Sequence, residues 1–433
     1  MLSNNTNLRL KHTMPSDGNS AAAYAGYAFT ETSFTYPITP STTASELVES
    51  WAHADKRKNA MGVVPTVVMM EHEGGVAGAM HGASVTGALT STFTSSQGLL
   101  LMLPNIFKLR YGKVPTVFHV ASRSVITAMG TIECDHSDVM AIRSAGAALL
   151  SSSSNQDCHD LAAVAHASAI KGMVPFVHFF DGFRTSHQIT NVDFLEYDDF
   201  KTLIDQEQLQ KFRQRAFNPN HPSFRMMAID SSFHFQADIA AGYLHTKIPD
   251  IVQESMDKVG KLTGRPLHLF DYYGHPQAES VIVVMGSTAQ NIQEAVDYMN
   301  SQGKKYGVVT VRLFRPFSTK HLLQALPKSC KVVTVLDRVR ETGANSQPLH
   351  SDVCTALTSI DDKRKVLGGV FGIGGRELTP SQATSVFENS LKSSPNNFFT
   401  VGINDDLTHT SLPLPKEIDM VPEGTKQCIF WDL

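Results

Sequence analysis

The feature that most constrains this fold is a repeated unit: a short apolar segment, a polar corner, and then a helical stretch. The unit recurs from Ala21 to about Ile170, as in "TVVMM" before "EHEGGVAGAMHGA" and "ALTSTFT" before "SSQGLLLMLPNIF". The segments "TVFHVAS", "AALLS" and "VPFVHFF" are further strands that end in polar corners. Successive βα units are typical of a parallel, doubly wound sheet with helices on both faces. We therefore expect an α/β domain whose polar corners meet at one edge of the sheet.

A second α/β unit begins at residues 280–303, where the apolar strand "SVIVV" leads through Gly286 into an amphipathic helix. Before it, residues 185–258 include the Pro- and Asn-rich segment "FNPNHPSFRMMAIDSSFHFQ", which we expect to be a long surface connection. A length of 433 residues favours two or three domains. We expect one domain at residues 15–258 and a second, also doubly wound, at residues 259–415.

The two ends of the chain differ from these domains. Residues 1–14 are rich in Ser and Asn and carry basic residues but no acid, so they fit either a cleavable organellar presequence or a frayed terminus. Residues 416–433 end in "EGTKQCIFWDL", which looks like the start of a linker with a strand that is cut short.

Composition excludes several classes of function. The formal net charge of −4 gives no basic footprint for nucleic acid. No apolar run is long enough to span a membrane; the longest candidate, residues 98–107, is cut by Pro104 and is expected in the core. The five cysteines form no Cys-x-x-Cys pair, which disfavours zinc and iron–sulfur sites and favours reduced thiols in an intracellular compartment.

One corner reads "YPITPSTTASE". Pro37 and Pro40 restrict the backbone and remove two N–H donors, so the chain must turn sharply after the preceding strand. The hydroxyls of "STT" can cap the next helix, with Glu46 as the acid of a capping box. Thr39 is then left on a rigid corner with its hydroxyl free, at the sheet edge where α/β proteins bind ligands. An ordinary strand-to-helix turn is the alternative.

Two further corner residues could carry chemistry. Glu73 stands between an apolar strand and a Gly/Ala-rich helix. It is either a helix-capping acid or a carboxylate in an apolar crevice that shares a proton with a ligand nitrogen. Arg123 follows the strand "TVFHVAS", where it forms either a structural salt bridge or a planar grip on a small carboxylate.

Other polar motifs are less informative. The cluster Asp135-His136-Ser137-Asp138 has no second His or Cys group at ligand spacing, so a metal site there is disfavoured. The serines of "SSQG" lack the nucleophile elbow of hydrolases. The "GIGG" segment at 372–375 does not have the dinucleotide-binding spacing and is expected to be a turn.

Taken together, the corners resemble one family, the pyruvate:ferredoxin oxidoreductases, within the wider 2-oxoacid:ferredoxin oxidoreductases. Matching segments include "YPITPS", "GGVAGAMHGA", "TSTFTSSQGLLLM", "PTVFHVASRS", "DHSDVMA", "VPFVHFFDGFRTSH" and "FTVGINDDLTHTSLP". The resemblance runs from about Pro15 to Leu433 with small gaps, and it is specific because the segments are long and keep their order. It implies a pyrimidine-type thiamin-diphosphate-binding domain followed by a transketolase C-terminal-like domain, which is mainly structural.

The resemblance also implies a reaction: oxidative decarboxylation of pyruvate to acetyl-CoA and CO2, with coenzyme A as co-substrate and ferredoxin or flavodoxin as electron acceptor. The family's strand-end glutamate falls on Glu73, whose carboxylate would hydrogen-bond the pyrimidine N1′ of thiamin diphosphate. Thr39 and Arg123 fall on positions that contact the 2-oxoacid, Arg123 through its carboxylate, and Thr39 would also contact the cofactor. Mg²⁺ and the iron–sulfur clusters would come only from further domains. The family resemblance also favours a homodimer.

Some residues depart from the family pattern. Cys134 stands where the family usually has glycine, and Glu71-His72 replaces Gln-Ser, which adds two ionisable groups beside Glu73. The family's later domains are absent from this sequence, so we expect the isolated chain to be inactive. Alternatives are a non-catalytic truncated paralogue that serves as a dimerising scaffold or regulatory partner, or a module of another redox complex. We expect a cytoplasmic location, or a hydrogenosome-like organelle if the N-terminal segment is a presequence.

Overall fold

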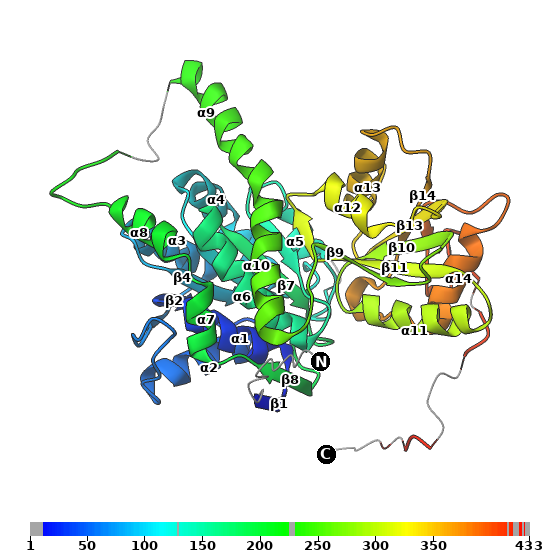
Figure 1. The fold of residues 1–433 in the computed structure, drawn as a ribbon, viewed down its shortest axis with the longest axis horizontal. Coiled ribbons are helices and arrows are strands. Elements are labelled where there is room, and N and C mark those ends of the chain that lie inside the picture. Colours follow the sequence, from blue (N-terminus) through cyan, green and yellow to red (C-terminus); the bar gives the residue numbers. More distant parts are fainter. Residues whose placement is uncertain are drawn as a thin grey trace, which may run out of the picture.

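The computed structural model describes residues 12–127, 130–224, 230–413, 415–418, 424–426 and 428. Within them the chain forms a seven-stranded sheet, a six-stranded sheet and a two-stranded ribbon. The two larger sheets belong to two bodies that lie side by side, each with helices packed around its sheet (Figure 1). The α/β architecture expected for both halves of the chain is confirmed. Residues 1–11 and most of the expected C-terminal strand lie outside the described residues.

The first sheet contains the strands that precede the predicted corners. Its order is β12-β6-β7-β5-β4-β2-β3, and every neighbouring pair except β12-β6 is parallel. The carboxyl ends of the parallel strands therefore share one edge. Its strands are β2 (Thr32–Thr35), β3 (Thr66–Met69), β4 (Thr90–Thr94), β5 (Thr116–Ser122), β6 (Ala148–Ser151), β7 (Phe176–Asp181) and β12 (Leu313–Arg315).

Helices follow these strands as the sequence pattern predicts. Strand β5 is buried at every position, because helices cover both faces of the sheet. None of the helices in the described part of the chain combines the length and the apolar character needed to cross a membrane. The helices of this half are α1 (Gly18–Phe29), α2 (Thr42–His53), α3 (Glu73–Val85), α4 (Ser96–Gly112), α5 (Ser137–Ala141), α6 (Asn155–Gly172), α7 (Tyr197–Leu203), α8 (Gln206–Gln214), α9 (Ser231–Tyr243) and α10 (Ile248–Thr263).

The second sheet has the order β15-β14-β13-β10-β11-β9, with β9 antiparallel to β11 and the other pairs parallel. The "GIGG" segment forms a short 3₁₀ turn after β14, as expected. The elements of this half are β9 (Phe270–Gly274), β10 (Ser280–Val284), α11 (Thr288–Ser301), β11 (Tyr306–Val311), α12 (Thr319–Ala325), β13 (Val332–Asp337), α13 (Pro348–Thr358), β14 (Lys365–Val370), α14 (Pro380–Ser390) and β15 (Phe399–Thr400).

The two halves are less separate than the sequence suggests. Strand β12 belongs to the second half of the sequence, yet it pairs antiparallel with β6 and completes the first sheet. Helix α10 runs to Thr263 and packs on α6, across the expected boundary at residues 258 and 259. Both features depend on contacts between distant segments, which local sequence patterns do not report.

The N-terminal boundary also differs from the expectation. Residues 12–14, expected to belong to a presequence or a frayed end, form strand β1 (His12–Ser16), which pairs with β8 (Thr190–Phe194). The pairing partner lies far along the chain, so the N-terminal sequence alone does not reveal it.

Residues 185–258, which include the segment 217–236 expected as a long surface connection, contain several regular elements. They contain β8, α7, α8, α9 and most of α10. Helix α9 has no buried residue and projects away from the first body (Figure 1). It exposes Phe233, Phe235, Ile239 and Tyr243. Because α9 buries no face of its own, its apolar residues do not follow the period of an amphipathic helix.

Two local expectations were wrong. Residues 98–107, which we expected in the core, lie in α4, and one face of that helix, with Leu101 and Phe107, is exposed. Ser41 is the N-cap of α2 but makes no side-chain cap, since its hydroxyl donates to the Ile38 carbonyl at 2.9 Å. The expected capping box is thus replaced by a bond that closes the preceding turn.

Three histidines form a hydrogen-bonded chain in the core of the first body. His119 Nδ1 lies 2.9 Å from His178 Nδ1, and His119 Nε2 lies 3.1 Å from His166 Nε2. The chain ends at Ser152, whose hydroxyl lies 2.8 Å from His178 Nε2. Burial lowers the pKa of all three imidazoles, that of His178 to about 3. They are therefore neutral at pH 7.

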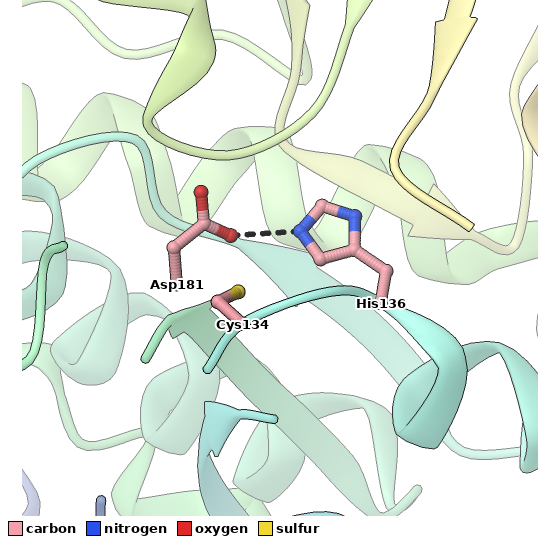
Figure 2. A group of neighbouring side chains, drawn as sticks. All are labelled: Cys134, His136 and Asp181. Carbon is pink, nitrogen blue, oxygen red and sulfur yellow. Dashed lines mark hydrogen bonds and ion pairs between the residues drawn. The ribbon is translucent and has the colours of Figure 1, made fainter. Parts of the chain in front are cut away.

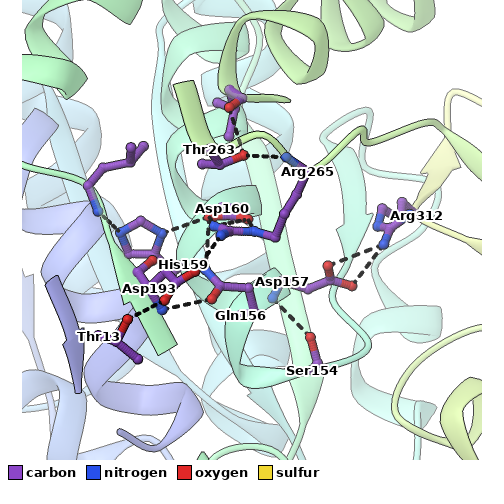
Figure 3. A network of polar contacts seen from close by, with 12 residues as sticks. Thr13, Ser154, Gln156, Asp157, His159, Asp160, Asp193, Thr263, Arg265 and Arg312 are labelled. Carbon is purple, nitrogen blue, oxygen red and sulfur yellow. Dashed lines mark hydrogen bonds and ion pairs between the residues drawn. The ribbon is translucent and has the colours of Figure 1, made fainter. Parts of the chain in front are cut away.

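Ion pairs fasten α6 to the segments that follow α10 and β11 (Figure 3). The Arg265 guanidinium binds the buried carboxylate of Asp160 with three contacts of 2.9–3.0 Å. Arg312 binds Asp157, one turn earlier on the same helix, at 3.2 Å. These contacts hold the second half of the chain against the helix that covers the first sheet.

Candidate functional site

Thr39 lies in the turn between β2 and α2. Its side chain is exposed and has no hydrogen-bond partner among the described residues. The turn is fixed by Asn19, whose side-chain amide donates to the Pro40 carbonyl at 2.7 Å. The backbone N–H of Ser41 closes it by donating to the Ile38 carbonyl at 2.8 Å. The Thr39 hydroxyl is thus presented at the sheet edge on a constrained turn.

Glu73 is the first residue of α3, and its side chain is 7% exposed. A Cβ atom on Gly98 would lie 2.8 Å from Glu73 Oε1 and 2.6 Å from Thr94 Oγ1. The carboxylate therefore lies against the end of β4, and only glycine fits at position 98. Among the described residues, neither the Glu73 carboxylate nor the buried Thr94 hydroxyl has a hydrogen-bond partner. A buried polar pair without protein partners fits a site that receives a polar ligand group.

Glu73 lies in the first turn of α3, as the capping alternative expects of an acid near a helix N-terminus, but it is not the N-cap residue. His72 is the N-cap of α3, and its Nδ1 accepts the Gly75 backbone N–H at 3.3 Å. Glu71 and His72 are both exposed, unlike Glu73. The three consecutive ionisable residues therefore have different surroundings, and only Glu73 is enclosed beside β4.

Arg123 follows β5 and contacts the turn that holds Thr39. Its Nη1 donates to the Thr39 carbonyl at 2.9 Å, and its Nε is buried without a partner. In the part of the chain that the structure describes, no acidic side chain pairs with it. The structural salt bridge considered from the sequence is therefore not formed there, and the guanidinium keeps N–H groups that could bind a carboxylate.

The three residues surround the end of one strand. Glu73 follows β3, Thr39 follows β2 and Arg123 follows β5, and β4 lies between β2 and β5. Neighbouring strands are ~4.8 Å apart, so these corners lie within a region roughly 15 Å wide. The shared sheet edge that the sequence predicts therefore brings all three candidates together.

Asp138 organises this edge, a role that sequence reasoning missed. Its buried carboxylate accepts the backbone N–H groups of Ser96 at 2.9 Å and Arg123 at 3.0 Å, and the Ser122 hydroxyl at 2.7 Å. Ser96 has a left-handed backbone (φ 47°), which is uncommon outside glycine and typical of functional corners. Burial raises the pKa of Asp138 to about 6, although the hydrogen bonds that it accepts lower it in part. The cluster Asp135-His136-Ser137-Asp138, at which the sequence disfavours a metal site, thus contains an anchor for two corners.

Cys134, His136 and Asp181 gather beside this edge (Figure 2). All three are buried, and His136 Nε2 lies 2.7 Å from Asp181 Oδ1. Asp181 Oδ2 is bound by Arg338 Nη1 at 2.8 Å and by the hydroxyl of Ser287 at 2.6 Å. A carboxylate already paired with an arginine is a poor metal ligand, so the trio serves as a junction between the two halves.

The electrostatics of this junction are consistent with an ion pair. Burial alone would raise the pKa of Asp181, but Arg338, His136 and Ser287 together hold it well below its usual range. Burial strongly raises the pKa of the Cys134 thiol, which is therefore not a reactive thiolate. Cys134, which replaces the usual glycine, is thus accommodated as a small buried side chain.

Comparison with protein families identifies the chain. Residues 22–257 match the family model described as pyruvate flavodoxin/ferredoxin oxidoreductase, thiamine diP-bdg. The chain belongs to this oxidoreductase family. Residues 278–383 match a second model, pyruvate:ferredoxin oxidoreductase core domain II. The resemblance found in the sequence is confirmed, and the corners described above lie in the thiamine diphosphate-binding part.

Curated members of the family are similar over almost the whole chain. Pyruvate:ferredoxin oxidoreductase of Moorella thermoacetica is 49% identical over 417 residues, which cover 96% of this chain and 36% of that protein. Pyruvate-flavodoxin oxidoreductase of Enterobacter agglomerans is 47% identical over 418 residues, again 96% of this chain and 36% of the relative. The chain thus spans about a third of the length of these oxidoreductases.

A solved structure supports the fold. A 2-oxoglutarate:ferredoxin oxidoreductase from Magnetococcus marinus superimposes with a TM-score of 0.62 at 19% sequence identity, and the match covers 88% of this chain and 66% of that chain. At this identity the likeness concerns the fold alone, and it agrees with the two α/β bodies found here.

Proposed function

We propose that this chain forms the pyrimidine-binding half-site of a pyruvate:ferredoxin or pyruvate:flavodoxin oxidoreductase. The observation that carries the proposal is the enclosed carboxylate of Glu73, which has no protein partner among the described residues. It lies at the edge where Arg123 contacts the Thr39 turn. Such a carboxylate loses hydration and needs a partner, which a ligand nitrogen that carries a proton would supply. The residues present therefore fit the pyrimidine end of thiamin diphosphate.

Each residue has a separate role in this proposal. Glu73 holds a proton at the pyrimidine N1′, Thr39 contacts cofactor and 2-oxoacid, and Arg123 binds the carboxylate of pyruvate with its remaining N–H groups. Thiamin diphosphate, when bound, supplies the chemistry that stabilises the carbanion left by decarboxylation. Because Arg123 is fastened to the Thr39 carbonyl and to Asp138, the carboxylate-binding group is positioned before substrate arrives.

The remaining components belong to the complete oxidoreductase. We propose that Mg²⁺ and the iron–sulfur clusters are held by other domains, that coenzyme A and ferredoxin or flavodoxin are used by the whole assembly, and that the isolated chain is inactive. We also propose that the assembly is a homodimer in the cytoplasm, or in a hydrogenosome-like organelle if residues 1–14 act as a presequence. The apolar side chains exposed on α9 are of the kind that subunit or domain contacts bury.

A chimaera tests the proposal directly. This chain would replace the corresponding part of the Moorella thermoacetica relative, and pyruvate-dependent reduction of ferredoxin would be measured. We expect activity in the chimaera and a loss on the order of 10²–10⁴-fold in Glu73→Gln, as when general acid–base catalysis is removed. The exposed neighbour provides a matched control, because Glu71→Gln should keep the activity.

Unchanged turnover in Glu73→Gln would contradict the assigned role. A folded chimaera without activity, combined with tight binding of the isolated chain to the intact relative, would instead favour a non-catalytic scaffold. If the chimaera reduces ferredoxin with no response to pyruvate, the chain would be a module of another redox complex.

A further inference from the structure

A polar cavity of about 250 Å³ opens where three segments meet: the start of α6, the chain after β7 and the start of α11. It is distinct from the site above, because Thr39, Glu73 and Arg123 do not line it. Every residue that lines it is polar, and none carries a carboxylate. Such a lining favours a small, strongly hydrated ligand over an apolar one.

The lining of this cavity contains one charged side chain, which is positive. Arg184 lines it, is exposed, and has no ion-pair partner among the described residues. The carboxylate of Asp157, in the first turn of α6, is already bound by Arg312 at 3.2 Å and by the Ser153 hydroxyl at 2.6 Å. Burial alone would raise the pKa of Asp157, but Arg312 and Ser153 lower it overall. Asp157 thus has a cationic partner, which it shares with Asp271, and Arg184 is the one charged side chain that lines the cavity.

The start of α11 already binds an oxyanion within the protein. The backbone N–H and the hydroxyl of Ser287 donate to Asp181 Oδ2 at 2.9 and 2.6 Å. Ser287 also lines the cavity, and so does Gln290, whose side chain has no partner in the described part of the chain. The start of α11 therefore holds one carboxylate, that of Asp181, and the Gln290 side chain beside it keeps donors that no described residue uses.

We propose that this cavity binds a phosphate group, with Arg184 as its charge partner and Gln290 as a hydrogen-bond donor. Guanidinium groups match the geometry of phosphate oxygens, and the polar lining adds the unpaired amide of Gln290 as a neutral donor. Pockets for drug-sized ligands measure roughly 300–1,000 Å³, so this volume suits inorganic phosphate or a small phosphomonoester. The proposal rests on none of the residues assigned to the pyrimidine half-site.

The test uses the 433-residue chain, titrated with inorganic phosphate and, separately, with glycerol 3-phosphate at constant ionic strength. Binding would be measured by isothermal titration calorimetry, and the thermal unfolding midpoint would be followed in parallel. We expect saturable binding that Arg184→Gln weakens about tenfold or more, because one charged hydrogen-bond partner is lost. Arg376→Gln is the matched control, since Arg376 is exposed and does not line the cavity.

Each result has a defined meaning. Tighter binding of inorganic phosphate identifies the free ion as the ligand, and tighter binding of glycerol 3-phosphate identifies a phosphomonoester. Gln290→Leu provides a second variant, which should weaken the same probe even if Arg184→Gln folds poorly. The proposal is overturned if neither probe binds saturably, or if wild type and both variants bind phosphate equally.

Discussion

Asp181 and Arg338 form a buried ion pair, 2.8 Å between Oδ2 and Nη1, that joins the end of β7 to the end of β13. Both side chains are at most 1% exposed. Glu377 and the Gly372 carbonyl bind the rest of the guanidinium. The two sheets are therefore coupled through one carboxylate from the first body and one arginine from the second.

Replacing Asp181 by asparagine should weaken the coupling between the two bodies, which β12 and the ion pairs of α6 would still hold together. The substitution keeps the size of the side chain but leaves a buried arginine with half of its compensation, and breaking such a pair typically costs about 3–5 kcal/mol. We expect the urea concentration at the unfolding midpoint to fall, followed by near-UV circular dichroism. Asp361→Asn removes an exposed pair with Lys363 and should leave the curve almost unchanged. A single unshifted transition in Asp181→Asn would argue against the coupling.

Substituting Arg123 by lysine should weaken pyruvate binding in the chimaera. A lysine keeps the charge but cannot contact both the Thr39 carbonyl and a carboxylate in the planar geometry of arginine. We expect KM for pyruvate to rise about tenfold to a hundredfold, measured by steady-state ferredoxin reduction. An unchanged KM would mean that Arg123 only supports the turn.

Asp138→Asn should remove the pH-dependent contribution of this carboxyl group to the free energy of unfolding. The folded pKa of Asp138 is raised to about 6, so its contribution to stability is fully present below the unfolded pKa of about 4 and is lost as the pH rises through 6. Relative to the variant, wild type should therefore gain stability when the pH falls from 7.5 to 4.5. Denaturant unfolding at several pH values measures the difference, and a constant difference would contradict the assignment.

The histidine chain predicts the opposite pH dependence. The folded pKa values of His119, His166 and His178 are lowered, so their contribution is complete above the unfolded pKa of about 6.5 and is lost as the pH falls below it. Each imidazole contributes a slope of up to about 1.4 kcal/mol per pH unit. In urea unfolding, His166→Gln should reduce the slope of the unfolding free energy against pH by up to about one proton between pH 6.5 and 5, with the full effect at the lower end.

His409→Asn is the control for this experiment. His409 is exposed, and its left-handed backbone (φ 53°) is one that asparagine tolerates. The slope of the unfolding free energy against pH should be the same in His409→Asn as in wild type. Equal slopes for His166→Gln and wild type would show that His166 takes up no extra proton when the protein unfolds.

The sequence predicts most strands and corners because their signals are local. The apolar runs before Thr39, Glu73 and Arg123 mark strands of a parallel sheet, and the parallel arrangement alone places their ends at one edge. The anchoring by Asp138 could not be predicted in this way, since its donors come from corners far apart in the chain. The same holds for His178, which reads as one polar residue in an apolar strand until its partners, His119 on β5 and Ser152 just after β6, are known.

The pairing of β12 with β6 has a consequence for synthesis on the ribosome. Strand β7 ends at Asp181, but the strand that closes the opposite side of β6 begins only at Leu313. About 130 residues must therefore be translated in between, which takes roughly 7–26 s at ~5–20 residues per second. During that interval the nascent first sheet carries an open edge, and a chaperone or the helices around it must shield that edge until Leu313–Arg315 arrives.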